Sequence, residues 1–228
     1  MDPVLQFYIT ADGSHTLLNT DLNETYHSRH GAIRESMHVF IHNGLQWATS
    51  AFRGGELHLL EVGFGTGLNA LLTAMRTTVP VRYTAIEPFP LKPSQIKQLN
   101  YTTCLDADDH LTHAFEEMHA VPWGRPQAIT PLFTIHKINT PLQSTDLLPA
   151  SFDLLYYDAF APGKQPEMWD FQTLGLLAQA LKSGGYLVTY CAKGQLKRDL
   201  KVLDFTVETL AGPPGKAEMI RARRNGST

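Results

Sequence analysis

A glycine-rich segment, Gly63–Gly67, directly follows the short apolar run Leu57–Val62. Glycine lets a backbone turn sharply and lets a ligand approach closely, because it has no Cβ atom. The spacing is GxGxG and no Lys-Ser or Lys-Thr pair follows, which disfavours both the dinucleotide fingerprint GxGxxG and a phosphate-cradling loop. Glu61 precedes the glycines, where a carboxylate would repel a pyrophosphate but suit a cationic amino-acid ligand. The segment therefore predicts a cofactor-binding loop rather than only a tight turn.

Two further carboxylates end apolar runs. Glu87 lies 20 residues past Gly67, after the run Val81–Ile86, and a carboxylate there can accept both hydroxyl protons of a ribose. Asp158 ends the run 152–157, where a charge is costly unless it is paired or used. The aromatic and proline residues after Asp158 predict a rigid wall. Ligands bind beyond the carboxyl ends of parallel strands, so we expect the three loops to form one site.

The elements that position these loops follow from hydrophobic periodicity. A strand, the glycine loop, a helix and a second strand form a βαβ unit, and strands and helices alternate along the rest of the chain. This order predicts an α/β, Rossmann-like sandwich with a mostly parallel seven-stranded sheet and helices on both faces, in a single domain over residues 1–228 whose N-terminal extension, about 1–52, packs on it. We predict strands over about 57–62, 81–86, 133–138, 152–158, 186–190, 205–210 and 218–223, and helices over about 35–52, 68–75, 92–99, 106–119, 171–181 and 194–202.

Composition narrows the class of protein. Hydrophobic residues make up 43% and charged residues 18% of the 228 residues, which is ordinary for a globular protein. No run reaches the roughly 18 apolar residues of a membrane span. Met1–Val4 shows no secretory signal, and two distant cysteines fit a reducing compartment, so we expect a cytoplasmic protein without membrane association. The ten histidines form no HExxH motif, and we predict no metal site.

Charge is distributed unevenly. The whole chain has a formal net charge of −3, which excludes an overall basic surface. Residues 193–224 hold eight basic and four acidic residues, so this segment carries +4 and the rest carries −7. A local phosphate-binding patch is one interpretation, and a solvated helix face is the other. The candidate patch residues are Lys193, Lys197, Arg198 and Lys201.

The pattern of strand, Glu-x-GxGxG, helix, acid-ended strand and Asp158-x-Phe-x-Pro resembles the class I S-adenosylmethionine-dependent methyltransferases. The segments Asp158–Trp169, Glu24–Phe40 and Gly212–Arg221 resemble the methyltransferase domain of the MnmC family of tRNA 5-methylaminomethyl-2-thiouridine biosynthesis proteins. The resemblance spans roughly residues 20–223; the Gly loop is specific only to the superfamily, and the Asp158 segment is much more specific. The flavin-dependent oxidase half of that family does not fit in 228 residues, so we expect no flavin oxidase domain in this chain.

This resemblance implies a reaction and a set of roles. The family methylates the amine of 5-aminomethyl-2-thiouridine at the wobble position of tRNA, so tRNA is the implied partner and S-adenosyl-L-methionine the implied cofactor. Asp158 is implied to orient the amine and to accept or relay its proton. The implied cofactor-binding residues are Glu61, Gly63, Phe64, Gly65, Gly67 and Asn69 for the methionine part, Glu87 for the ribose and Pro88 near the adenine, with Asp158 beside them. The implied substrate-binding residues are Tyr26, His27, Ser28, Phe160, Pro162, Lys164 and Trp169.

Three other readings stay open. A methyltransferase or aminopropyltransferase for a small amine would show similar loops, and the basic tail and the segment at Tyr26 argue mildly against it. A dinucleotide oxidoreductase is disfavoured by GxGxG and Glu61. A non-catalytic RNA-binding module is disfavoured because Glu61, the Gly loop, Glu87 and Asp158 are all intact.

Overall fold

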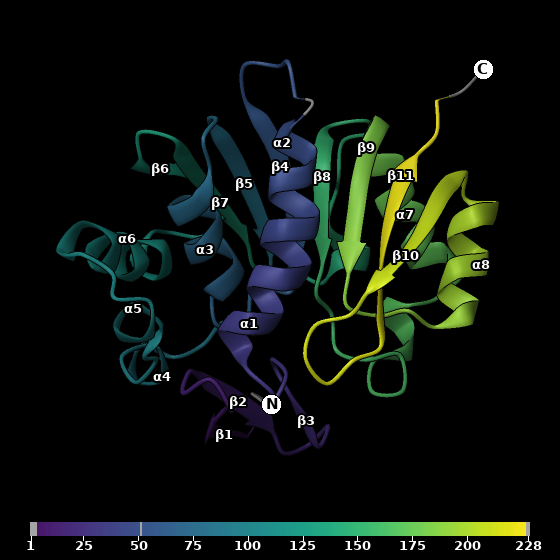
Figure 1. The fold of residues 1–228 in the computed structure, drawn as a ribbon. Coiled ribbons are helices and arrows are strands. Elements are labelled where there is room, and N and C mark those ends of the chain that lie inside the picture. The colour runs from purple at the N-terminus through teal and green to yellow at the C-terminus, as the bar shows by residue number, and fades with distance from the viewer. Residues whose placement is uncertain (1–3, 51, 227–228) are drawn as a thin grey trace.

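The computed structural model describes residues 4–50 and 52–226 and shows a large β-sheet between two layers of helices (Figure 1). The predicted domain, 1–228, includes residues 1–3 and 227–228, which lie outside the described residues. The helix predicted over 35–52 includes residue 51, which also lies outside them. None of the helices in the described segments is long and apolar enough to cross a lipid bilayer. The helical elements are α1 (Ala32–Ser36), η1 (Met37–Gln46), α2 (Trp47–Ser50), α3 (Leu68–Arg76), α4 (Pro93–Ile96), α5 (Tyr101–Cys104), α6 (Asp109–Ala120), η2 (Leu142–Ser144), η3 (Pro166–Met168), α7 (Phe171–Ala180) and α8 (Gly194–Val202).

Within the described residues, the large sheet has eight strands in the order β10-β11-β9-β8-β4-β5-β7-β6. Its strands are β4 (Leu57–Val62), β5 (Val81–Ile86), β6 (Pro126–Thr130), β7 (Phe133–Ile138), β8 (Phe152–Tyr157), β9 (Leu181–Thr189), β10 (Phe205–Ala211) and β11 (Glu218–Arg224). The five central strands are parallel, and β6, β10 and β11 pair antiparallel at the two edges. The predicted α/β fold with a mostly parallel sheet is confirmed, and β6 adds an edge strand to the seven predicted ones.

The strand order reverses beside β4. From β4 the chain builds outward through β5 and β7 on one side, and then returns to place β8 and β9 on the other side. Because β4 pairs parallel with both β5 and β8, the loops that follow these three strands emerge on the same side of the sheet, at the carboxyl ends of its parallel strands. Such a reversal opens a crevice for ligands at the carboxyl ends of the strands, and it brings the three predicted loops together.

Alternating side chains of β4 face two separate apolar cores. Leu57 and Leu59 pack into the core beneath α1, η1, α2 and α3, whereas Leu60 and Val62 pack into the core beneath α7 and α8. This alternation is the period-2 geometry of a strand buried on both faces, and it explains why the run is continuously hydrophobic.

The N-terminal region forms a second, smaller sheet. Strands β1 (Leu5–Ile9), β2 (His15–Asn19) and β3 (Glu24–Thr25) pair antiparallel and lie at the end of the large sheet where the central strands finish (Figure 1). The helix predicted over 35–52 begins earlier, at Ala32, and its middle part Met37–Gln46 is π-helical. Wider π-helical turns are common near functional sites, and this helix leads directly from the small sheet across the large one.

Two histidines, the buried His27 and the half-buried His119, hold the glycine loop at Thr66. His27 Nε2 lies 2.8 Å from Thr66 Oγ1, and His119 Nε2 donates to the carbonyl oxygen of Thr66 at 3.1 Å. Burial disfavours the imidazolium form and lowers the pKa of both side chains to about 4, and the nearby Lys137 ammonium further lowers that of His119. Both histidines therefore support the loop as neutral groups.

The lowered pKa of these two histidines predicts that the protein loses stability in mild acid. Because their pKa falls from 6.5 to about 4 on folding, the unfolded chain binds more protons between these values. The stability that they contribute is complete above pH 6.5 and is lost as the pH falls toward 4. Each should lower the free energy of unfolding by about 2 kcal/mol between pH 7 and pH 5. Urea unfolding should be measured at pH 7 and pH 5. For His119→Gln, the decrease in the free energy of unfolding between these pH values should be about 2 kcal/mol smaller than for the wild type.

The solvent-exposed His113 lies on the same helix, α6, and provides the control. His113→Gln should keep the wild-type difference between pH 7 and pH 5. Asp158, whose pKa is raised to about 7, also titrates in this range, but it is unchanged in both variants and cancels from the comparison. Equal acid sensitivity of His119→Gln and His113→Gln would contradict the assignment of a neutral His119.

Candidate active site

A cavity of about 670 Å³ lies beyond the ends of β4, β5 and β8. Its volume is in the range of small-molecule and cofactor sites. The predicted residues on its wall are Tyr26, His27, Ser28, Gly63, Phe64, Gly65, Glu87, Pro88, Asp158 and Phe160. The N-terminal segment, the glycine loop, the end of β5 and the Asp158 loop therefore meet as the sequence predicts.

Two glycines allow close approach of neighbouring segments in the cavity wall. Gly63 has φ +92°, and a Cβ atom there would lie 2.7 Å from the carbonyl oxygen of Asp158. Gly65 has φ +49°, and a Cβ atom there would lie 2.9 Å from Cδ1 of Tyr26. A side chain at either position would push the Asp158 loop or the Tyr26 ring away and would fill the space beside the loop.

Glu87 accepts two backbone hydrogen bonds and still has acceptor capacity. Its Oε2 accepts from Gly65 N at 2.9 Å, and its Oε1 accepts from Phe89 N at 2.8 Å. Burial raises the pKa of Glu87, while these two bonds work against that rise. Each carboxylate oxygen has a second lone pair, so two hydroxyl groups of a ribose could donate to it without displacing the backbone bonds.

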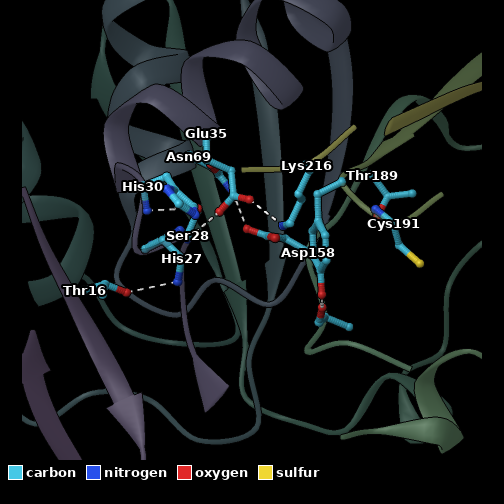
Figure 2. Close-up of polar contacts among 12 residues, drawn as sticks. Thr16, His27, Ser28, His30, Glu35, Asn69, Asp158, Thr189, Cys191 and Lys216 are labelled. Atoms are coloured by element: carbon cyan, nitrogen blue, oxygen red, sulfur yellow. Dashed lines mark hydrogen bonds and ion pairs between the residues drawn. The ribbon is translucent and has the colours of Figure 1, made fainter. Parts of the chain in front are cut away.

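Asn69 connects two of the predicted carboxylates. Its Nδ2 donates to Glu61 Oε1 at 3.0 Å and to Asp158 Oδ2 at 2.9 Å, which uses both amide hydrogens (Figure 2 shows Asn69 and Asp158). Burial, with a smaller contribution from Glu35, raises the pKa of Asp158 to about 7, although the bond from Asn69 opposes this. Asp158 therefore changes charge near neutral pH, which suits a group that exchanges a proton.

Glu61 lies behind this cluster. Its side chain is fully buried, its pKa lies well above the usual range because of burial, and the Tyr83 phenol beside it favours the ionised form. Among the described residues, Glu61 Oε2 and Asn69 Oδ1 have no hydrogen-bond partner. The described cavity wall includes neither these two residues nor Gly67. Glu61 therefore acts on the cavity indirectly, through Asn69 and the Asp158 carboxylate to which Asn69 also donates.

The structure adds an ion pair that the sequence analysis did not assign to the site. Glu35 Oε1 lies 2.6 Å from Lys216 Nζ, and Glu35 Oε2 accepts from Ser28 N at 2.6 Å (Figure 2). Both side chains line the cavity. The two residues are 181 positions apart, so no spacing rule could pair them. Their only signal was that each lies in a segment that resembles the MnmC family.

Three predicted substrate-binding residues take other positions. Pro162, Lys164 and Trp169 are not part of the described cavity wall. Trp169 is buried against Tyr157, with ring centroids 4.7 Å apart, and its Nε1 donates to Phe160 O at 2.7 Å. Trp169 therefore fixes the backbone at Phe160, whose ring forms a T-shaped contact with that of Tyr26, with ring centroids 5.1 Å apart.

The cavity thus combines two kinds of recognition. One half, at Glu87 and the glycine loop, offers acceptors and close backbone approach, which suit a nucleoside. The other half, at Asp158 and Glu35, offers carboxylates that suit an amine. Among the described residues, no group of three or more histidine, cysteine, aspartate or glutamate side chains is arranged to hold a metal ion.

Comparisons with known proteins agree with this architecture. Residues 126–225 match the model of a family described as S-adenosyl-L-methionine-dependent methyltransferase. The crystal structure of MNMC2 from Aquifex aeolicus has a TM-score of 0.75 and covers 100% of this chain and 72% of that one. Its sequence identity is 22%, so this likeness supports the fold.

Two curated relatives carry the name tRNA 5-methylaminomethyl-2-thiouridine biosynthesis bifunctional protein MnmC. The protein from Pseudoalteromonas atlantica is 30% identical over 92% of this chain and 32% of its own length. The protein from Cupriavidus necator is 31% identical over 86% of this chain and 31% of its own length. The chain thus spans about a third of the length of these relatives. The chain is therefore similar to S-adenosyl-L-methionine-dependent methyltransferases over residues 126–225, and over most of its length it is MnmC-like in sequence and in fold.

Proposed function

We propose that this protein transfers a methyl group to the primary amine of 5-aminomethyl-2-thiouridine at the wobble position of tRNA. The observation that carries the proposal is the position of Asp158. It lies at the end of β8, beside the nucleoside half of the cavity, and its pKa of about 7 lets it hold or accept a proton. The similarity to proteins named for 5-methylaminomethyl-2-thiouridine biosynthesis in tRNA supports the choice of substrate.

The residues present fit S-adenosyl-L-methionine, the cofactor of the family. Glu87 would hold the ribose hydroxyls, and Pro88 and Phe89 would border the adenine. The cradle at Gly63 and Gly65, which line the cavity, would receive the methionine part. When bound, this cofactor supplies an electrophilic methyl group on a sulfonium sulfur.

Asp158 performs two tasks in the proposed reaction. It orients the acceptor amine, since a carboxylate binds an ammonium group strongly. The amine must lose a proton before it can attack, because an ammonium ion has no lone pair, and Asp158 can accept that proton or pass it to water. The carboxylate also favours the charged amine, so deprotonation is the part of the cycle most sensitive to pH. Most of the remaining rate enhancement comes from holding two reactants in line.

Replacement of Asp158 should abolish efficient transfer. We expect Asp158→Asn to lower the rate about 100-fold or more, because it removes the proton acceptor. The purified protein would be incubated with labelled S-adenosylmethionine and bulk tRNA from cells that lack this gene, and the labelled nucleoside identified after digestion. The wild-type rate should rise with pH and level off above about 7, as Asp158 ionises.

Asp146→Asn, at a solvent-exposed loop position, is the matched control and should retain the wild-type rate. Label in 5-methylaminomethyl-2-thiouridine that disappears with Asp158→Asn would support the proposal. Cofactor binding without label in any nucleoside would instead favour a methyltransferase for a small amine. Unchanged transfer by Asp158→Asn would contradict the assigned role.

Lys193, which precedes α8, and the basic residues of α8 are the proposed contact with the tRNA backbone. Helix α8 begins just after β9, whose end lies beside the end of β8. Lys193, Arg198 and Lys201 are exposed, whereas Lys197 forms an ion pair with Glu218 at 2.8 Å. One of the four candidate positive charges is thus compensated within the protein, and the other three side chains remain exposed.

Charge reversal tests this patch. We expect Lys193→Glu with Lys201→Glu to weaken tRNA binding and to reduce the slope of log affinity against log salt by about 0.7 to 0.9 for each phosphate that the variant no longer neutralises. Binding would be measured at several salt concentrations. Reversal of Arg53 and Arg76, two exposed residues outside the patch, makes the same change in net charge and should leave the slope unaltered. Equal slopes for the two double variants would contradict the patch.

A further inference from the structure

Lys216 places its ammonium group among acidic and aromatic side chains inside the cavity. Its Nζ lies 2.6 Å from Glu35 Oε1 and 3.7 Å from the centroid of the Tyr190 ring. It also interacts electrostatically with Asp158, toward which it points in Figure 2. A carboxylate, an aromatic face and a second carboxylate together make a cation site that is selective for an alkylammonium group.

The surroundings of this ammonium are anchored independently of Lys216. Glu35 Oε2 accepts from Ser28 N at 2.6 Å, and Tyr190 Oη donates to Ala159 O at 2.8 Å. Asp158 Oδ2 accepts from Asn69 at 2.9 Å. Each of the three groups is thus held by a second contact, so the site would keep its shape if Lys216 moved out.

Lys216 itself can leave this position without a change of fold. Its loop, residues 212–217, joins β10 to β11 and is closed by hydrogen bonds from Gly212 N to Ala217 O and from Lys216 N to Pro213 O. The backbone is therefore fixed, and the ammonium lies at the end of a flexible four-carbon stem. The side chain is a third exposed, so it has a path to solvent.

We infer that Glu35, Tyr190 and Asp158 form a primary-ammonium subsite, which Lys216 occupies until the acceptor amine displaces it. The acceptor part of this inference rests on the proposed function, because an aminomethyl group and a lysine side chain both end in a primary ammonium on a methylene carbon. The exchange swaps one cation for another, so the carboxylates stay compensated throughout. Lys216 is therefore a specificity-determining residue: an acceptor enters only if it pairs with Glu35 as well as Lys216 does.

The subsite can be tested without any methyl transfer. Lys216→Ala removes the atoms of a propylammonium ion, so propylammonium chloride is the probe and its binding is followed by NMR titration. We expect millimolar binding to Lys216→Ala, and at least tenfold weaker binding to the wild type and to Lys216→Ala with Glu35→Gln. Propanol, which has the same shape without the charge, should not bind. Equal propylammonium affinity in all three proteins, or none in Lys216→Ala, would overturn the subsite.

A second measurement tests displacement by the acceptor. Lys216→Met keeps most of the stem but removes the competing charge, so the KM for acceptor tRNA should fall about three- to tenfold. Lys182→Met removes a lysine from an ion pair with Asp153, at the opposite edge of the sheet, and should keep the wild-type KM. A raised KM in Lys216→Met would show that Lys216 helps to bind tRNA and would overturn the displacement. If the wild type methylates no tRNA, the proposed function fails, and the propylammonium titration still decides the subsite.

Discussion

The concentration of carboxylates at one edge of the sheet is the constraint on which the rest of this site depends. Glu61, Glu87, Asp158 and Glu35 all lie in or directly behind one cavity, and burial alone would make their ionised forms costly. Each is compensated differently. Backbone N–H groups donate hydrogen bonds to Glu87, and the Asn69 amide donates to both Glu61 and Asp158. Lys216 forms an ion pair with Glu35. These partners come from three separate parts of the chain: the glycine loop with the start of α3, the segment after β5, and the loop between β10 and β11.

The N-terminal region contacts both the glycine loop and one of these carboxylates. The segment after β3 supplies the ring of Tyr26 against Gly65, the imidazole of His27 against Thr66, and the Ser28 backbone N–H group to Glu35. These contacts join the small sheet to the glycine loop and to helix α1. The small sheet is therefore coupled to the conformation of the glycine loop, so a shift of one should displace the other.

Local pattern was sufficient for much of the fold and for half of the site. Buried parallel strands are continuous apolar runs, and parallel pairing necessarily brings their following loops to one edge, so Glu87, Asp158 and the glycine loop could be grouped from the sequence. Strand β6 was missed because an edge strand needs no apolar face and begins at Pro126. The packing of Trp169 against Tyr157 could not be predicted, because an aromatic residue after Asp158 gives no local sign of the direction of its side chain. The pairing of Glu35 with Lys216 required the tertiary fold, since nothing in either local sequence specifies a partner 181 residues away.

In the proposed reaction, the positive charge of the acceptor amine poses the central chemical problem. Its positive charge attracts it to Glu35 and Asp158, yet the same proton prevents attack on a methyl group. A carboxylate with an ordinary pKa would hold the ammonium and leave it protonated. With a pKa of about 7, Asp158 binds a proton much more readily than an ordinary aspartate does. Burial, which makes the cluster costly to form, is thus also what lowers the cost of moving the proton from the amine to Asp158. Burial of the Asp158 carboxylate costs folding free energy, and the same burial raises its proton affinity at the position where the proposed reaction needs a proton acceptor.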